Sequence, residues 1–349
     1  MAGSYSSHSI PATLIPGDGI GPEIVASVVQ ILEAVDAPFV WDIQQAGMAA
    51  VQESLDPLPE PTLQSIRRNG LALKGPLTTP VGGGFRSINV RLREEFKLYA
   101  NVRPAQTLIP GGRYEDVDIV LIRENLEGLY VGFEHYIPID NDPHGAAISS
   151  GINTRAGSRR IARYAFEYAV KHGRKKITIV HKANILKALT GIFLETALDI
   201  AKDYVGRVQV DERIVDACAM QLVLDPTQFD VILTTNLFGD ILSDEISGLV
   251  GGLGLAPGAN IGEHAAIFEA VHGSAPDIAG RGIANPIALL SAAAMMLDHV
   301  DHQAKGQCLR QAIHEVLITD GVRTRDLKGD ASTQDITAAL LKRVAALRA

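Results

Sequence analysis

Residues 230–249 read DVILTTNLFGDILSDEISGL, and this stretch predicts the class of fold. Asp230 to Thr234 is a short run typical of a buried strand, and Leu237 to Leu249 follows with apolar residues at helical spacing. The same alternation runs along the rest of the chain. Further strands are expected at residues 12–16, 117–122 and 176–180, and further helices at residues 22–34, 158–171, 185–204, 284–300 and 305–319. This alternation predicts an α/β protein with mostly parallel sheets covered by helices.

Two short β-rich runs do not follow the alternation. Leu129 to Ile139 and Ala146 to Thr154 could instead form an antiparallel excursion. No repeat and no low-complexity linker stands out between them or elsewhere, so composition does not place a domain boundary.

The composition limits the classes of protein that this chain can be. Its 349 residues suffice for two domains or one large one, and 46% hydrophobic with 21% charged residues is ordinary for a soluble enzyme. The net charge of −8 argues against a general nucleic-acid binder, which needs a basic face. The chain has no long apolar stretch, no signal-like start, and two cysteines that give neither a disulfide framework nor metal-ligand spacing. We therefore expect a cytoplasmic protein with no nucleic-acid or membrane partner.

Residues 74–104 concentrate arginines on this acidic chain. The segment reads KGPLTTPVGGGFRSINVRLREEFKLYANVRP and carries small polar side chains among the arginines. A guanidinium can donate two parallel hydrogen bonds to one carboxylate, so the segment predicts a site for an anion. Arg91, Glu94, Glu95 and Lys97 are expected instead to be ordinary charges of a solvated helix.

Gly17-Asp-Gly-Ile-Gly21 stands between an expected strand and an expected helix, where a dinucleotide fingerprint would lie. The fingerprint requires Gly-x-Gly-x-x-Gly, and position 22 is a proline. Proline suits the first turn of a helix, so we interpret this loop as a tight structural turn. A nucleotide, if one binds, binds elsewhere.

Asp240 and Asp244 are four residues apart on the expected helix and therefore share one face. Two like charges at this spacing destabilise a helix, and no basic residue lies between them. A divalent cation explains the pair, because Mg²⁺ and Mn²⁺ prefer carboxylate oxygens. The alternative is two solvated aspartates on the helix surface.

Two further polar side chains follow expected strands. Tyr130 comes soon after Arg123 and could be a general acid beside a bound anion, or a packing tyrosine. Lys182 follows the strand at 176–180 and could act as a base, or be solvated.

The polar loop at 268–286 then carries a Glu, a His, an Asp and an Asn, and an acidic residue there could accept hydrogen bonds from a ribose 2′-OH.

Together these segments resemble the β-decarboxylating dehydrogenases, the family of isocitrate, 3-isopropylmalate, homoisocitrate and tartrate dehydrogenases. NLFGDILSD at 236–244 and HGSAP at 272–276 are highly specific to that family. The resemblance covers nearly the whole chain and implies the isocitrate/isopropylmalate dehydrogenase-like fold, which is not a Rossmann fold. It implies a large domain of residues 1–98 and 251–349 and a small domain of residues 99–250. The small domain is expected to carry a clasp that pairs two chains into a homodimer, or a higher oligomer, with shared active sites.

The resemblance also points to a substrate. Isocitrate enzymes are similar to this chain in having Ser and Asn at the positions of Ser87 and Asn89, whereas isopropylmalate enzymes carry apolar residues there. A serine and an asparagine can hydrogen-bond an extra carboxylate, which a leucine cannot. The resemblance implies that Arg93, Arg103 and Arg123 bind the substrate carboxylates and that Thr79 helps to orient them. The implied activity is oxidative decarboxylation of isocitrate to 2-oxoglutarate and CO₂, and the alternatives are a homoisocitrate or 3-isopropylmalate dehydrogenase, or a non-catalytic regulatory subunit.

For the cofactor, the resemblance implies NAD. NADP-dependent relatives carry Lys and Tyr where this chain has Asp277 and Ile278, and a carboxylate repels a 2′-phosphate. Arg325 departs from the pattern that indicates NAD, because its guanidinium could bridge to a 2′-phosphate. The remaining cofactor contacts implied by the resemblance are Thr78, Asn184, Glu269, His272, Gly273, Ser274, Ala275, Pro276, Asn285 and Asp326.

The implied mechanism uses Mg²⁺ or Mn²⁺ held by Asp240, Asp244 and Asp216 of the partner subunit. Lys182, also from the partner by resemblance, helps to take the hydroxyl proton, and Tyr130 protonates the enol that decarboxylation leaves. By its own context Asp216 is an ordinary first-turn residue of a helix, where an acidic side chain is favoured.

Overall fold

The computed structural model describes residues 9–54, 56–78, 87–110 and 113–348, which fold into two compact units. Unit 1 comprises residues 1–98, 107–115 and 247–349, and unit 2 comprises residues 99–106 and 116–246. This division differs from the expected one in two places. Unit 2 ends at residue 246 rather than 250, and residues 107–115 return to unit 1.

Unit 1 is built on five strands in the order β2-β1-β3-β12-β11 within the described residues. The strands are β1 (Ile10–Ile15), β2 (Phe39–Ile43), β3 (Leu71–Lys74), β11 (Pro257–Ile261) and β12 (Ala266–Ala270). All neighbours are parallel except β11 and β12. Because β3 and β12 lie inside the sheet, every side chain on them is buried, which fits their near-continuous apolar sequence.

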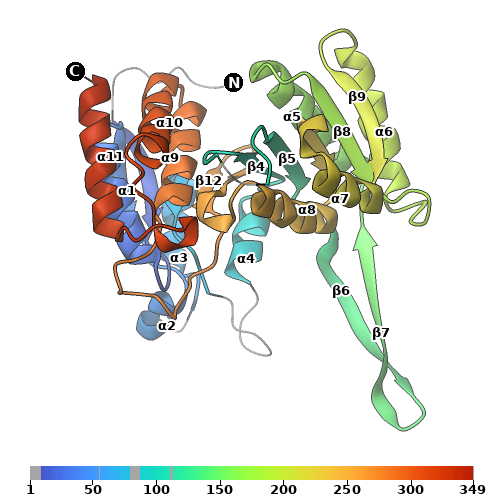
Figure 1. Cartoon of the computed structure of the whole chain (residues 1–349). Coiled ribbons are helices and arrows are strands. Elements are labelled where there is room, and N and C mark those ends of the chain that lie inside the picture. Colours follow the sequence, from blue (N-terminus) through green and yellow to red (C-terminus); the bar gives the residue numbers. More distant parts are fainter. Residues whose placement is uncertain (1–8, 55, 79–86, 111–112, 349) are drawn as a thin grey trace. The chain divides into compact units, whose positions relative to one another are not determined.

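The helices of unit 1 bury one another as well as the sheet (Figure 1). They are α1 (Gly21–Ala34), α2 (Met48–Ser54), α3 (Glu60–Asn69), α4 (Ile88–Glu95), α9 (Ile287–His299), α10 (Gln303–Ile318) and α11 (Thr333–Arg348), with short 3₁₀ turns η3 (Leu253–Leu255) and η4 (Arg325–Leu327). Helix α9 is apolar on nearly all sides, and it contacts β11 and β12 as well as α1 and α10. A helix of this kind belongs in a core, and α9 is the centre of this one.

Unit 2 has five sheet strands in the order β4-β5-β10-β8-β9 and a separate two-stranded hairpin. They are β4 (Ala100–Gln106), β5 (Asp118–Glu124), β8 (Lys176–His181), β9 (Gln209–Ile214) and β10 (Val231–Thr234), parallel except for β4 against β5. Its helices are α5 (Arg155–Lys171), α6 (Gly191–Ala201), α7 (Val215–Leu224) and α8 (Asn236–Leu249), with 3₁₀ turns η1 (Lys202–Tyr204) and η2 (Pro226–Gln228). The last three residues of α8 belong to unit 1. The mixed, mostly parallel sheet strands covered by helices confirm the predicted α/β class.

The predicted antiparallel excursion is confirmed as a separate hairpin of β6 (Gly128–Ile139) and β7 (Asp142–Ile152). In Figure 1 this hairpin extends away from the helices of unit 2. Large apolar side chains on it are exposed, among them Phe133, Tyr136 and Ile139. None of the described helices of either unit is long and apolar enough to cross a membrane.

The helix expected at residues 185–204 is wrong at its N-terminal end. Residues 185–190 form turns, and α6 begins only at Gly191. The Thr190 hydroxyl accepts a hydrogen bond from the Lys182 N–H at 3.2 Å and donates to the Leu186 carbonyl at 3.1 Å. These local side-chain bonds offer the backbone an alternative to helix, a competition that apolar periodicity does not reveal.

Candidate active site

Arg123 is the penultimate residue of β5 and is buried, with 1% of its side chain exposed. Its Nε and Nη2 donate to the amide oxygen of Asn236 at 3.0 and 2.7 Å, and its Nη1 pairs with the carboxylate of Asp240. The guanidinium carbon lies 5.4 Å from the centre of the Tyr130 ring, and the Tyr130 hydroxyl donates to Asp240. The contact arises because β10 pairs in parallel with β5 and leads directly into α8. The tyrosine and the arginine that the sequence suggested thus meet at one aspartate.

Arg103, on β4, reaches the next turn of the same helix. Its Nη1 donates to Ser243 Oγ at 2.6 Å and to Asp244 Oδ1 at 3.2 Å, and its Nη2 lies 3.9 Å from Asp240. The repulsion expected between the two aspartates is therefore offset by arginines from two strands. The local sequence of α8 contains no such cation, so only the tertiary structure supplies it.

Lys182 and Asp216 form a second polar pair in unit 2. Lys182 follows β8, and Asp216 lies in the first turn of α7, which follows β9. Because β8 and β9 are parallel neighbours, the two side chains meet at their carboxyl ends, and the Lys182 ammonium donates to the carboxylate. This hydrogen bond lowers the pKa of Asp216. The first-turn position expected for Asp216 is confirmed.

The donor chemistry of Asp240 and Asp244 suits a hard divalent cation, because both offer carboxylate oxygens on partly exposed side chains. Among the described residues of this one chain, no three His, Cys, Asp or Glu side chains are grouped so as to hold a metal ion. Asp216, the residue expected to supply the third metal ligand, is paired with Lys182. The two aspartates of α8 therefore offer two carboxylate ligands to a divalent cation.

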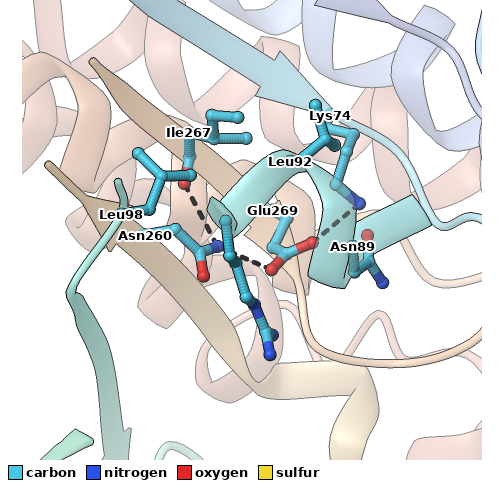
Figure 2. Close-up of a pocket in the computed structure, with 8 residues that line it drawn as sticks. Lys74, Asn89, Leu92, Leu98, Asn260, Ile267 and Glu269 are labelled. Atoms are coloured by element: carbon cyan, nitrogen blue, oxygen red, sulfur yellow. Dashed lines mark hydrogen bonds and ion pairs between the residues drawn. The ribbon is translucent and has the colours of Figure 1, made fainter. Parts of the chain in front are cut away.

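Unit 1 holds a buried ion pair between neighbouring strands (Figure 2). Lys74 on β3 and Glu269 on β12 are register partners, and Nζ lies 2.7 Å from Oε2. Asn260 on β11 donates to the other carboxylate oxygen at 2.7 Å. Burial alone would raise the pKa of Glu269, but Lys74 and Arg93 outweigh it and lower the pKa to about 2. Glu269, assigned by resemblance to the cofactor, is thus an anion with both oxygens engaged by this pocket.

Helix α4 forms another wall of the pocket that Lys74 and Glu269 line. Asn89 and Arg93, four residues apart, face it together, and Ser87 stands immediately before the helix. The amide oxygen of Asn89 is buried without a hydrogen-bond partner among the described residues. Thr79 lies outside the residues that the structure describes.

The loop after β12 is anchored to the loops after β1 and β3. The Ser274 and Thr78 hydroxyls are 2.7 Å apart, and the Ser274 carbonyl accepts from the Ile20 N–H at 2.9 Å. A Cβ on Gly19, whose φ is +59°, would lie 1.9 Å from that carbonyl oxygen. The glycine loop is therefore a closely packed turn, as the sequence predicted. Asp18 fixes it further by accepting from the Thr78 and Met48 N–H groups, each at 2.8 Å.

His272 opens the loop that the sequence assigned to a nucleotide. Its Nδ1–H donates to the Gly273 carbonyl at 3.0 Å, and its Nε2 is buried with no hydrogen-bond partner in the described part of the chain. Burial lowers the pKa of this imidazole, which favours the neutral form with Nε2 as an acceptor. An unpartnered acceptor in a polar loop fits a hydroxyl-bearing ligand such as a nucleotide.

The tip of this loop is partly open to solvent. Ala275 has a φ of +39°, and its carbonyl accepts from the Ile278 N–H at 3.1 Å, which closes a turn. Pro276 and Asp277 are exposed on that turn. The carboxylate of Asp277 is therefore available to a ligand.

Asn285 and Asp326 are brought together, as their shared assignment to the cofactor requires. The Asn285 amide donates to Asp326 at 2.9 Å, and the Thr324 hydroxyl donates to the other Asp326 oxygen at 2.6 Å. A Cβ on Gly254 would lie 2.2 Å from Asp326, so the backbone approaches this carboxylate closely. Asn184, by contrast, lies in unit 2 on an exposed turn.

Several contact-making residues were not singled out from the sequence as site residues. Asn236 and Ser243 were read only as part of a family motif, yet each binds an arginine. Lys74 was noted only as the first residue of the arginine-rich segment, and Asn260 carried no local signal at all. Their partners lie on other strands, so no spacing rule could have found them.

Comparison with known proteins shows which family and which relatives the chain is similar to. The family model described as isocitrate/isopropylmalate dehydrogenase matches residues 12–340. The chain is 47% identical over 338 residues to the NAD isocitrate dehydrogenase catalytic subunit 6 of Arabidopsis thaliana, covering 96% of this chain and 88% of that one. It is also 47% identical over 311 residues to the chloroplastic 3-isopropylmalate dehydrogenase of Solanum tuberosum, covering 88% and 85%. The crystal structure of an isocitrate dehydrogenase from Methylococcus capsulatus matches with a TM-score of 0.92 and 54% identity, over 96% of this chain and 99% of that one.

The fold and the matched family thus define a decarboxylating dehydrogenase. The chain belongs to the isocitrate/isopropylmalate dehydrogenase family, as its motifs predicted. Relatives of different substrate are similar to it at equal identity, so identity alone does not choose the substrate.

Proposed function

We propose that this protein is an NAD-dependent, metal-dependent isocitrate dehydrogenase. The observation that carries the proposal is the charge of the pocket beside α4. Lys74 and Arg93 bring two positive charges and Glu269 one negative charge, and Asn89 adds an amide on the same wall. The net positive charge and the amide on this wall suit the extra carboxylate of a tricarboxylic hydroxy acid, and Leu92, Leu98 and Ile267 complete the lining.

Three arginines are proposed to bind the substrate carboxylates. Arg93 acts with Ser87 and Asn89 on the distinguishing carboxylate. Arg103 and Arg123 bind the other carboxylates. Guanidinium groups are suited to this task because they are permanently charged and planar.

The side chains proposed to transfer protons, Tyr130 and Lys182, belong to unit 2. When bound, NAD supplies a hydride acceptor, and Mg²⁺ or Mn²⁺ supplies Lewis-acid polarisation of the hydroxyl and of the carbonyl that replaces it. Asp240 and Asp244 would hold the metal together with Asp216 of the partner subunit. Lys182 of the partner subunit, as the neutral amine, receives the hydroxyl proton, and Tyr130 gives a proton to the carbon that loses CO₂. The Tyr130 hydroxyl already donates to Asp240, which keeps the proton at the metal-binding helix.

The proposed oligomer is a homodimer that shares active sites. The Lys182–Asp216 pair supports it. Within one chain these two side chains form an ion pair with each other, and the described residues of that chain place no third acidic ligand beside the aspartates of α8. The exposed apolar side chains of the β6–β7 hairpin supply a surface for the second chain.

Asp277 supports NAD as the cofactor. Its exposed carboxylate would repel the 2′-phosphate of NADP and accept hydrogen bonds from the ribose hydroxyls of NAD. Arg325, exposed at the start of η4, is the side chain that could permit some NADP use.

The test is a set of initial rates of NADH formation with Mg²⁺, comparing isocitrate, homoisocitrate and 3-isopropylmalate, and then NADP in place of NAD. Rapid turnover of isocitrate with NAD alone is expected. The variant Asn89→Leu should lower kcat/KM for isocitrate about 100-fold and leave 3-isopropylmalate unaffected or improved. A wild-type preference for 3-isopropylmalate or homoisocitrate would overturn the substrate assignment, and no turnover of any of the three would favour a regulatory subunit.

A further inference from the structure

The first turn of α8 surrounds Arg123 on several sides. Asn236, Gly239 and Asp240 stand at positions i, i+3 and i+4 of this helix and therefore share one face. Asn236 accepts from the Nε and Nη2 groups of Arg123, and Asp240 pairs with Nη1. The two contacts lie at opposite ends of the guanidinium group.

Gly239 holds the stem of the same side chain. A Cβ at this position would lie 2.5 Å from Cγ and 2.7 Å from Cβ of Arg123. Real Cβ atoms do not approach that closely, so the arginine stem occupies the space that any other residue would fill. Glycine is otherwise costly inside a helix, by about 1 kcal/mol relative to alanine. The close approach of Arg123 explains why a glycine stands there.

Asn236 is itself fixed from the other side. Its Nδ2 group donates to the Glu127 carbonyl at 3.0 Å, which leaves the amide oxygen directed at Arg123. The Glu127 carboxylate in turn accepts from the Thr154 N–H at 2.8 Å and from its hydroxyl at 2.6 Å, just before α5. The amide of Asn236 therefore cannot rotate to present its nitrogen to the arginine without losing bonds at both ends.

We propose that Asn236 is the positioning residue that orients Arg123 for substrate binding. This inference rests on the proposed function, in which Arg123 binds a carboxylate of the hydroxy acid. The Nε–Nη2 edge of the guanidinium is the edge that usually pairs with a carboxylate through two parallel bonds. Here Asn236 accepts from that edge, so Arg123 meets the substrate with its Nη1 end, beside Asp240. The geometry makes Asn236 a determinant of carboxylate binding without any contact to the substrate.

The experiment measures KM for isocitrate, KM for NAD and kcat in Asn236→Ala, with Mg²⁺ in excess. Loss of two bonds to a charged donor is expected to raise KM for isocitrate about 10- to 100-fold and to leave KM for NAD within about threefold. The matched control is Thr196→Val. It removes a buried hydroxyl that donates to the Ile192 carbonyl within α6 and is bonded to none of Arg123, Asn236 and Glu127, so both KM values should stay near those of the wild type.

A second variant keeps the test decisive if Asn236→Ala folds poorly. Gly239→Ala removes no hydrogen-bonding group and favours helix formation, yet its methyl group must displace the Arg123 stem. It should raise KM for isocitrate in the same way. In an Arg123→Lys background, where the planar fork is gone, Asn236→Ala should change KM less than about threefold.

The outcomes separate this inference from the proposed function. An active wild type whose KM for isocitrate is unchanged by both Asn236→Ala and Gly239→Ala would overturn the positioning role and leave the proposed function standing. Equal loss in Thr196→Val would show a general structural effect and also overturn it. If the wild type prefers another hydroxy acid of the panel, the same comparison is made with that substrate, and a wild type that oxidises none overturns both proposals.

Discussion

Replacement of Lys74 by methionine is the perturbation whose cost the structure defines most closely. The Lys74 side chain is 2% exposed, and its Nζ lies 2.7 Å from a Glu269 oxygen that is itself buried. Methionine keeps the length of the stem and removes the charge. The variant therefore leaves an anion in the interior of the β3–β12 pair with its nearest cation gone.

The expected cost is about 3–5 kcal/mol of unfolding free energy at pH 7.5, the range seen when one partner of a buried pair is removed. Two estimates bracket this range. The direct attraction at 2.7 Å is about 6 kcal/mol at an effective dielectric constant of ~20, before the desolvation of Lys74 is subtracted. Lowering the pKa of Glu269 from 4.5 to about 2 corresponds to roughly 3 kcal/mol.

The dependence on pH follows from the direction of this shift. Because the folded-state pKa of Glu269 is below its unfolded value of 4.5, its ionised form stabilises the wild type above pH 4.5, and this contribution is lost as the pH falls toward 2. Without Lys74 the pKa of the buried carboxyl rises, so the anion becomes protonated instead. The cost of Lys74→Met should therefore be smaller at pH 4.5 than at pH 7.5.

The assay is equilibrium unfolding in urea, at one protein concentration, for Lys74→Met, Glu269→Gln and the double variant at both pH values. Glu269→Gln should recover most of the stability lost in Lys74→Met, because it removes the unpaired charge and keeps an acceptor for Asn260. A cost below about 1 kcal/mol at pH 7.5, or a double variant no more stable than Lys74→Met, would refute the reasoning.

Three further predictions concern other sites. Burial raises the pKa of Glu124 to about 7, so its ionisation opposes folding between pH 4.5 and 7; Glu124→Gln should gain up to about 3 kcal/mol relative to the wild type between pH 5 and 8, measured by urea unfolding. A gain that does not grow with pH would contradict the assignment. Gly19→Ala should destabilise by about 2 kcal/mol or more, because its Cβ meets the Ser274 carbonyl and its φ is positive; an unchanged melting temperature would count against this. Tyr130→Phe should lower kcat about 10²- to 10⁴-fold while stability changes by about 1 kcal/mol, and a kcat near that of the wild type would remove Tyr130 from proton transfer.

Local sequence was informative where a residue's role depends on its immediate neighbours. The strand–helix alternation, the hairpin at 128–152 and the first-turn position of Asp216 follow from periodicity and turn chemistry, and the structure contains all three. The start of α6 did not follow, because the Thr190 hydroxyl bonds the Lys182 N–H across eight residues and holds turns where a helix was expected. Periodicity records apolar spacing and carries no information on such bonds.

The sequence by itself determined the family and the residue types of the site, because the motifs at 236–244 and 272–276 are contiguous in the chain. Only the tertiary structure decided which charges neutralise one another. Asp240 meets Arg123 because β5 and β10 are neighbours, and Glu269 meets Lys74 because β12 and β3 are neighbours. These partners are separated by more than one hundred residues, and strand order, which no local pattern encodes, brings them within hydrogen-bonding distance.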